Sequence, residues 1–475
     1  MDVTSRQFSD KAHQALRDTV LQKALGHIEE GFVEARKNAA ANLPEFEELR
    51  DRGRDIRAHV IEHLGAYLRQ FEDQVYAQGG RVHWARDAAE ARQIVAEICA
   101  EQGARTIAKS KSMVTEEIEL VPHLEALGLK AVETDLGEYI IQLREEKPSH
   151  IIAPVIHLSK EQVSETFHEH HQIHGFEDKL TERAELVAQA RSVLRETFMD
   201  ADVGITGANF LVAETGSVVL VTNEGNADLV TSLPDTHIVV TGIEKVVPTL
   251  NACHTLLRLL VRSATGQETT TYTSFLTGPK RPKDANGPSN FHVVLVDNGR
   301  SAMINTQNRE MLHCIRCGAC LNHCPIYANI GGHAYGSVYP GPMGAVLTPQ
   351  LAGLADSVDL PNASTFCGKC EAVCPVRIPL PKMMRHWRES EFEQHLTPTG
   401  MRFGLGVWSW LGRHPALYRL VQRCARLGMR VLARNGWIKA LPLAGKGWTA
   451  WRDMRAPDGE SFQSQWAKRG KKEPA

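Results

Sequence analysis

The stretch CIRCGACLNHCP, residues 314–325, sets four cysteines at the spacing C-x2-C-x2-C-x3-C and follows the last with a proline. At this spacing the first three thiolates bind one iron–sulfur cube, and the fourth binds a second cube. A tight loop aims three sulfurs inward, and the proline redirects the chain so that the fourth sulfur faces elsewhere. The stretch therefore predicts a small region folded around two metal clusters.

A second stretch, CGKCEAVCP at 367–375, repeats the pattern without its first cysteine, because Ser364 stands in that place. By reciprocity, we expect Cys374 to complete the first cluster and Cys324 to join the second. The predicted ligands of the first 4Fe-4S cluster are Cys314, Cys317, Cys320 and Cys374, and those of the second are Cys324, Cys367 and Cys370.

The spacing leaves the fourth ligand of the second cluster open. The alternatives are solvent, a partner residue, a three-iron cluster, or one of the side chains Ser364, Cys99, Cys253 and Cys424. Structural zinc competes with this interpretation, but zinc prefers paired CxxC motifs and four ligands per ion. Seven cysteines do not divide into such sets. Disulfides fit less well, because clustered thiols of a cytoplasmic chain stay reduced.

The composition is that of a folded protein with several domains: 475 residues, 43% hydrophobic and 23% charged. We expect a helical N-terminal arm at 1–76, an α/β domain at 77–304, a helical dicluster ferredoxin domain at 305–390 and a basic, tryptophan-rich extension at 391–475. The 42 residues between Cys324 and Cys367 predict helices that bridge the two cysteine stretches.

Short apolar segments alternate with helical patterns within 77–304, which predicts the α/β class with a parallel or mixed sheet. The predicted strands are 105–109, 130–134, 150–153, 210–213, 218–222, 238–241 and 292–297, and the predicted helices are 88–102 and 115–127. We expect Gly216 in a hairpin turn, and Asn298-Gly299 turning the chain into another strand at 300–304. The segment 329–349, rich in glycine and proline, predicts a loop without a long element, and 382–394 predicts a helix.

The last 80 residues carry 15 Lys and Arg against 4 Asp and Glu, although the net charge of the whole chain is −2. Arginines alternate with leucines and valines over 417–434, which predicts a basic amphipathic helix. This helix suits an acidic partner protein or an anionic membrane surface with a quinone-linked acceptor. We expect no nucleic-acid partner. A polar N-terminus without a signal pattern predicts a cytoplasmic protein, with the inner face of the membrane as the alternative place for the tail.

Polar residues and glycines gather at predicted strand ends of the α/β domain, where the ligands of such sheets bind. A small ligand with a carboxylate is expected there, and the alternative is a set of hairpin turns with a charged rim. The candidate residues are Lys109, Lys111, Asn209, Glu214, Asn223 and Asn226. No GxGxxG motif follows a predicted strand and no P-loop motif is present, so we expect no flavin or nicotinamide.

Together with the cysteine stretches, several segments resemble the lactate-utilisation protein B family over nearly the full length. They are KSKSMVTEE (109–117), ETDLGEYIIQ (133–142), GITGANFLVAETGSVVLVTNEGN (204–226), SATGQ (263–267) and 331–349. The resemblance implies an iron–sulfur subunit in L-lactate oxidation to pyruvate, with lactate-utilisation proteins A and C as partners. It also implies a LUD-type α/β domain, similar to the fold group of sugar-phosphate isomerases and folate cyclo-ligases.

The cysteine spacing predicts an electron carrier, and the resemblance implies that it is a component of a lactate oxidoreductase complex. Neither identifies a catalytic residue. Two alternatives stay open. In one, the α/β domain itself acts on a small carboxylic acid and the clusters serve as its internal electron relay. In the other, the chain is an iron–sulfur redox sensor or scaffold.

Overall fold

Six parallel strands form the central sheet of the computed structural model, which describes residues 3–442, 445–450 and 452–469. The chain divides into two units, Met1–Leu396 and Thr397–Ala475, and the sheet belongs to the first. Its strands are β1 Arg81–Ala85, β2 Thr106–Lys109, β3 Lys130–Glu133, β4 Val203–Thr206, β7 Thr236–Gly242 and β10 Asn290–Val296. They lie in the order β1-β10-β7-β4-β2-β3, and every neighbouring pair is parallel.

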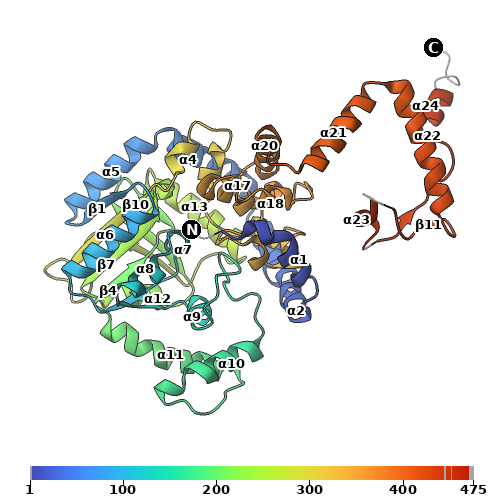
Figure 1. Cartoon of the computed structure of the whole chain (residues 1–475). Coiled ribbons are helices and arrows are strands. Elements are labelled where there is room, and N and C mark those ends of the chain that lie inside the picture. The colour runs from blue at the N-terminus through green and yellow to red at the C-terminus, as the bar shows by residue number, and fades with distance from the viewer. Residues whose placement is uncertain (1–2, 443–444, 451, 470–475) are drawn as a thin grey trace. The chain divides into compact units, whose positions relative to one another are not determined.

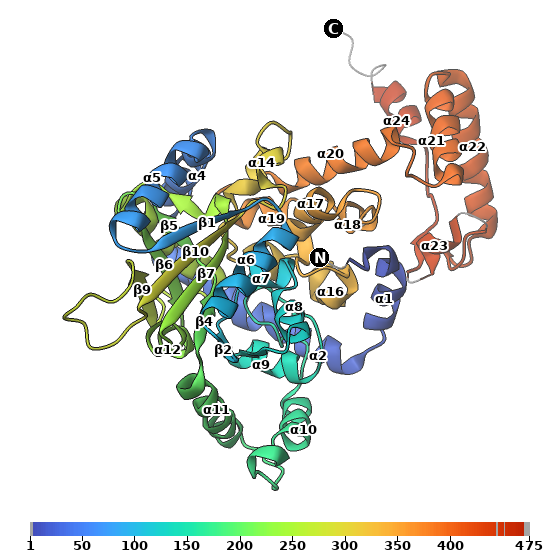
Figure 2. The ribbon, with the colours of Figure 1, turned by 60° about the vertical axis from the view of Figure 1, so that its left-hand side comes forward.

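Both faces of this sheet are covered (Figures 1 and 2). On β10, Phe291 and Val293 enter one hydrophobic core, whereas Val294 and Val296 enter another. Alternate side chains of a strand point to opposite faces, so a strand that is apolar throughout is buried on both sides. The helices of the face that holds Val294 are α6 Ala88–Glu101, α7 Met113–Glu117 and α8 Leu120–Ala126.

A smaller four-stranded sheet and three helices cover the opposite face. These elements are β5 Phe210–Val212, β6 Ser217–Thr222, β8 Val246–Val247 and β9 Tyr272–Leu276 with α4 Phe46–Glu62, α5 Leu64–Ala77 and α13 Leu250–Ala264. Strands β5 and β6 are antiparallel. Gly216 joins them at a φ of +69°, where a residue without Cβ is unstrained, and this confirms the predicted hairpin.

Further helices connect the strands. They are α9 Leu136–Leu143, α10 Lys160–His170, η3 Gln172–His174, α11 Arg183–Asp200, α12 Asn226–Ser232, η4 Ile243–Lys245 and α14 Arg300–Met303. Tyr139 of α9, Phe167 of α10 and Leu186 of α11 form a small core of their own, apart from the two cores of the sheet.

The N-terminal helices and the cysteine region complete the first unit. Their remaining elements are η1 Ser5–Gln7, α1 Phe8–Ala15, α2 Thr19–Ile28, η2 Glu29–Val33 and α3 Glu34–Ala41, then η5 Arg309–His313, α15 Ala319–Asn322, α16 Tyr327–Ile330, η6 His333–Tyr335, α17 Gly341–Ala352, α18 Asp359–Asn362, α19 Lys369–Val373 and α20 Leu380–Glu393. One hydrophobic core holds Leu25 of α2, Val219 of β6, Tyr339 and Met383 of α20. The arm, the sheets and the cysteine region therefore share a core.

Three expectations about secondary structure are wrong. Residues 150–153 form no strand, because the His150 ring accepts hydrogen bonds from the backbone N–H groups of Ile152 and Ala153 at 3.1 Å each and bends the chain. Residues 300–303 form the helix α14, since Asp297 accepts from the N–H of Ser301 at 2.6 Å.

The third concerns 329–349, which contains most of helix α17. Its residues are almost all buried, and this burial outweighs the glycines and the internal Pro349 that favour a loop. Helix α20, by contrast, confirms the helix predicted at 382–394.

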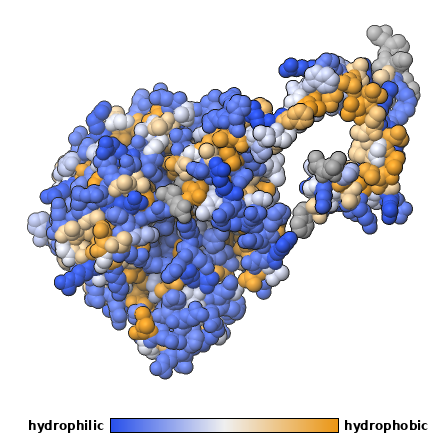
Figure 3. Space-filling model, viewed as in Figure 1, coloured by the Kyte–Doolittle hydropathy of each residue, from blue (hydrophilic) through white to orange (hydrophobic). Residues whose placement is uncertain are grey.

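The second unit holds α21 Thr399–Gly412, α22 Pro415–Leu432, β11 Trp437–Ile438, α23 Lys446–Thr449, β12 Met454–Arg455 and α24 Phe462–Arg469. Helix α22 confirms the predicted basic helix, and neither α21 nor α22 buries a residue. Apolar side chains lie open along both helices, among them Phe403, Leu427 and Val431 (Figure 3). Among the described residues, no helix combines the length and the hydropathy that a membrane crossing requires.

A network of buried ion pairs connects the cysteine region to the sheet. The Arg300 guanidinium donates to both carboxylate oxygens of Glu117, at 2.8 and 2.7 Å, and to Glu244 at 2.7 Å. Arg316, inside the first cysteine stretch, donates to the other oxygen of Glu244 at 3.3 Å. Burial alone would raise the pKa of Glu244, but Arg300 and Arg316 overcome it and lower that pKa to about 2. The network therefore stays ionised at neutral pH.

Replacing Arg300 by leucine tests this network. Arg300→Leu leaves Glu117 and Glu244 buried without their main partner, and we expect it to lower the free energy of unfolding by about 3–5 kcal/mol. Urea denaturation followed by circular dichroism measures the loss. Arg86→Leu is the control, because its ion pair with Glu90 lies at the surface and such pairs contribute little to stability. Equal stability of the two variants would contradict the network's structural role.

Candidate functional site

The two cysteine stretches share one backbone geometry. In each, the residue before a cysteine has a positive φ: Arg316 at +60° before Cys317, and Phe366 at +53° before Cys367. In each, a glycine with a φ of +73° or +77° follows that cysteine and begins a short helix, α15 or α19. The helices α15 and α19 pack on each other, so the two stretches form a local repeat.

Four thiols of the two stretches surround one small cavity. The cavity is lined by Cys314, Cys317, Cys320 and Cys374 together with apolar side chains such as Ile151, Met311 and Met343. Burial raises the pKa of Cys317 to about 12, and the neighbouring Cys374 and Cys314 add to the rise. Cys374 comes from the second stretch, so the two stretches cross at this cavity.

The other three cysteines form a second group. Burial raises the pKa of Cys370 to about 12, with nearby Cys324 and Cys367 as further causes. Cys367 is exposed, and the backbone N–H of Lys369 holds its pKa below the ordinary value. Tyr335 is fully buried, and its hydroxyl lies beside Cys324. The sequence analysis did not predict Tyr335 as a residue of this group. Hydrogen bonds to ligand sulfurs are one means by which proteins tune cluster potentials.

Both groups fit iron–sulfur clusters by their chemistry. Thiolates, not thiols, bind metal, and buried thiols ionise only when a positive charge compensates them. Three buried arginines of the N-terminal helices lie near the cysteines and donate to backbone carbonyls of the second stretch and of η5, which precedes the first stretch. Arg36 donates to Val373 O at 2.8 Å, Arg50 to Cys374 O at 2.8 Å, and Arg57 to Leu312 O at 2.8 Å. The arm therefore does more than cover the sheet, because it holds the cysteine loops in place.

The side chains considered as a fourth ligand of the second group lie in different surroundings. Cys99 lies in α6, in the core on the other face of the sheet. Cys253 is buried in α13, where burial raises its pKa to about 12. The Ser364 hydroxyl accepts from the N–H of Phe366 at 3.2 Å, and Cys424 is exposed on α22 of the second unit. None of these contacts selects one of them as a ligand.

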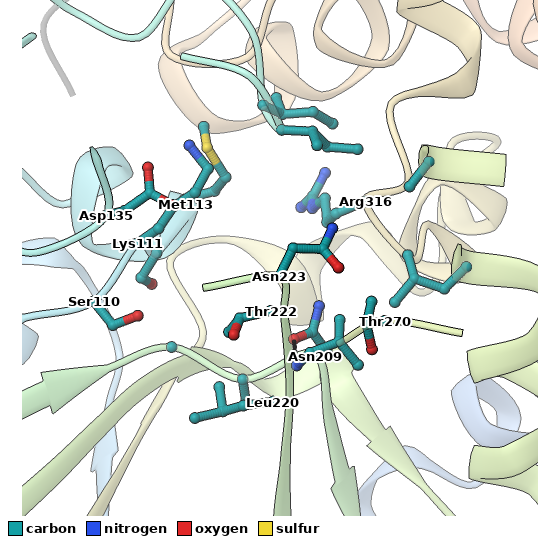
Figure 4. Close-up of a pocket in the computed structure, with 18 of the residues that line it drawn as sticks. Ser110, Lys111, Met113, Asp135, Asn209, Leu220, Thr222, Asn223, Thr270 and Arg316 are labelled. Atoms are coloured by element: carbon teal, nitrogen blue, oxygen red, sulfur yellow. Dashed lines mark hydrogen bonds between the residues drawn. The ribbon is translucent and has the colours of Figure 1, made fainter. Parts of the chain in front are cut away.

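A larger cavity of about 440 Å³ opens at the carboxyl ends of the parallel strands (Figure 4). Ser110 and Lys111 follow β2, Asp135 follows β3, Gly207 follows β4, and Thr241 is the last residue but one of β7. Arg316 enters from the cysteine region. Volume and position are those of ligand sites in α/β proteins. The sheet and the first cysteine stretch therefore share this cavity.

Four of the six residues that the sequence predicted for a ligand line this cavity. They are Lys111, Asn209, Asn223 and Asn226. Lys111 is paired with Glu138, and Asn209 accepts from the N–H of Val221 at 3.0 Å. Asn223 accepts from the N–H of Thr271 at 3.1 Å, so two of the asparagines hold the strand ends together.

The structure does not bring the other two predicted residues into the cavity. Lys109 is fully buried and donates to Glu133 at 2.5 Å and to Glu116 at 3.1 Å. Burial lowers the pKa of Lys109, but the two carboxylates overcome it and raise that pKa. Glu214 accepts from the N–H of Leu250 and stabilises the start of α13.

Sequence reasoning missed Thr241, Lys245 and Arg316 as residues of the cavity. Thr241 ends the strand that the sequence predicted at 238–241 and Lys245 follows it, so the rule for strand ends applies to both. Arg316 stands between the predicted metal ligands Cys314 and Cys317, and only the cysteines of this stretch were considered as functional residues.

Models of three protein families match parts of this chain. The LUD domain family matches residues 68–296, and the 4Fe-4S dicluster domain family matches 310–378. The family described as lactate utilisation protein B, C-terminal, matches 392–471. Lactate utilization protein B of Bacillus pumilus is 43% identical over 100% of this chain and 99% of its own.

The chain belongs to the lactate utilisation protein B family. The family member from Oceanobacillus iheyensis is 42% identical over 98% of this chain and 97% of its own. An Escherichia coli K12 relative, called an uncharacterized electron transport protein, YkgF, is 41% identical over 97% of this chain and 96% of its own. The match to the dicluster family places the cysteine region of this chain in an iron–sulfur domain.

Proposed function

We propose that the chain is the iron–sulfur electron-transfer subunit of a system that oxidises L-lactate to pyruvate. The observation that carries the proposal is the arrangement of seven cysteines in two neighbouring groups, each of which takes thiols from both stretches. Two adjacent clusters suit one-electron steps between a donor and an acceptor, whereas a structural cluster would need only one such group. The names of the relatives, in lactate utilisation and electron transport, point the same way.

We assign Cys314, Cys317, Cys320 and Cys374 to the first 4Fe-4S cluster and Cys324, Cys367 and Cys370 to the second. The donor set and the burial of the first group suit a cube with four cysteines. The second cluster takes three cysteines, and its fourth ligand stays open. The clusters would supply the one-electron chemistry, while the protein's own residues set their surroundings.

The remaining expectations belong to the same proposal. The four segments 1–76, 77–304, 305–390 and 391–475 serve as arm, ligand domain, electron-transfer domain and docking extension, and the α/β domain is of the isomerase and cyclo-ligase type. Lactate-utilisation proteins A and C are the proposed partners, in the cytoplasm. An acidic partner surface is the proposed target of α22, because its arginines lie open on a helix without buried residues.

Paired cysteine variants test the two ligand sets. We expect Cys374→Ala to remove the first cluster and Cys367→Ala to remove the second, so that each lowers the iron content from about eight to about four per chain. Electron paramagnetic resonance of the anaerobic, dithionite-reduced chain identifies which cluster is lost. Cys99→Ala is the matched control with full iron, because Cys99 lies in the core on the other face of the sheet, which holds none of the seven cysteines. Loss of the same signal in both variants would refute the assignment.

Reduction by lactate tests the role in electron transfer. We expect L-lactate to leave the clusters of the isolated chain oxidised and to reduce them once proteins A and C are added. Visible absorption under anaerobic conditions follows the bleaching, with D-lactate as the control substrate. Rapid turnover of L-lactate by the isolated chain with an artificial acceptor would favour the alternative in which this chain is itself the catalyst. Normal growth on lactate of a strain with Cys317→Ala would favour the sensor or scaffold.

The target of α22 can be tested by salt and by vesicles. Arg419→Gln with Arg423→Gln removes two charges from the exposed helix, and we expect association with the partner proteins to weaken about tenfold at low salt and less at high salt. Analytical ultracentrifugation measures the association. Flotation of the wild-type chain with phosphatidylglycerol vesicles is the counter-test, and strong binding there would assign the helix to the membrane instead.

A further inference from the structure

The cavity at the strand ends has a cationic end, where the carboxylate of Glu244 already pairs with two arginines. Arg316 and Lys245 line it there, with side chains that are nearly buried. Among the described residues, Lys245 makes no hydrogen bond or ion pair through its ammonium group. Burial and the neighbouring Arg316 lower the pKa of Lys245 to about 8, although Glu244 and Cys314 oppose this fall.

Two further polar atoms at this end lack partners. In the described part of the chain, Nη1 of Arg316 and Oγ1 of Thr241 are buried without a hydrogen-bond partner. Buried donors are nearly always satisfied in native proteins, because leaving one unmade is costly. Both residues line the cavity. A guanidinium N–H, an ammonium group and a hydroxyl therefore converge on one space.

Four buried cations lie around this space, and their partners differ. Arg57, Lys245, Arg300 and Arg316 face the buried carboxylates of Glu117 and Glu244 and the thiol of Cys314. Both oxygens of Glu244 are already taken, one by Arg300 and one by Arg316. Arg57 directs its guanidinium to backbone carbonyls, so Arg316 and Lys245 are the cations left for a ligand.

The opposite end of the cavity has a different character. Lys111 lies there with Asp135 (Figure 4), and Glu138 neutralises Lys111. Glu224 also lines the cavity, and burial raises its pKa, with Asp135 adding to the rise. An anion is therefore favoured at the Arg316 end and disfavoured at the Asp135 end. This polarity would orient a ligand that carries one carboxylate and a neutral remainder.

We infer that the cavity binds the carboxylate of a small 2-hydroxy or 2-oxo acid between Arg316 Nη1, Lys245 Nζ and Thr241 Oγ1. The inference rests on the proposed function only for the choice of acid. Arg316 also lies next to the first cysteine group, since its backbone N–H donates to Cys314 Sγ at 3.4 Å. An acid bound at Arg316 offsets positive charge beside Cys314. By linkage, the acid binds more tightly to the oxidised protein than to the reduced one.

Binding of L-lactate and pyruvate to the cluster-loaded full chain tests the site. Isothermal titration calorimetry under anaerobic conditions measures the affinity, with lactamide as the neutral analogue. We expect Thr241→Val to weaken binding of the acids about tenfold, as for the loss of a hydrogen bond to a charged group. Lys245→Met is expected to weaken it further. Thr236→Val is the matched control, because Thr236 lies buried at the other end of β7 and bonds to Gln102.

A second measurement connects the site to the first cluster. Saturating pyruvate is expected to lower the midpoint potential of the first cluster in the wild-type chain and to shift it less in Thr241→Val. Equal binding of lactamide and L-lactate, or affinities unchanged in both Thr241→Val and Lys245→Met, would overturn the inference. A chain that binds the acids but accepts no electrons in the presence of its partners would overturn the proposed function and leave this site standing.

Discussion

The ion pairs of Arg300 fix the positions of the sheet and the cysteine region relative to each other. Glu117 belongs to a helix on one face of the sheet, Glu244 follows the central strand β7, and Arg316 belongs to the first cysteine stretch. Buried charges tolerate little displacement, because each must keep its partners when water is excluded. The network therefore fixes the cysteine loop to the carboxyl edge of the sheet. The cavity at this edge is lined by residues of both parts, so its shape depends on this connection.

The strongest predictions from the sequence were those that depend only on residues close together in the chain. Cysteine spacing needs only neighbouring residues, and it led to the iron–sulfur domain that the family comparison supports. Apolar strands such as β7 and β10 were predicted for the same reason. His150 shows the limit, since a side chain that accepts backbone hydrogen bonds converts an apolar run into a bend. Helix α17 shows another, because burial from distant segments overrides its glycines.

The candidate ligand site was predicted in part. Strand-end reasoning found Lys111 and the asparagines, because the edge of a parallel sheet follows from strand positions. It could not separate Lys111 from Lys109, since only the fold shows which lysine is enclosed by carboxylates. Arg316 and Lys245 gain their meaning from partners far away in the sequence. Charged residues that are far apart in the sequence form no local pattern. Their pairing is therefore seen only in the three-dimensional structure.

The two cysteine groups differ in exposure, and this difference gives the proposed electron path two distinct ends. Cys317 is buried beneath the arm and the sheet, whereas Cys367 reaches the surface. Under the proposed assignment, the outer centre is the contact point for a soluble redox partner, while the inner centre is shielded from oxygen and adjoins the cavity. In the proposed electron-transfer role, the chain carries a shielded centre next to the cavity and an exposed centre at the surface.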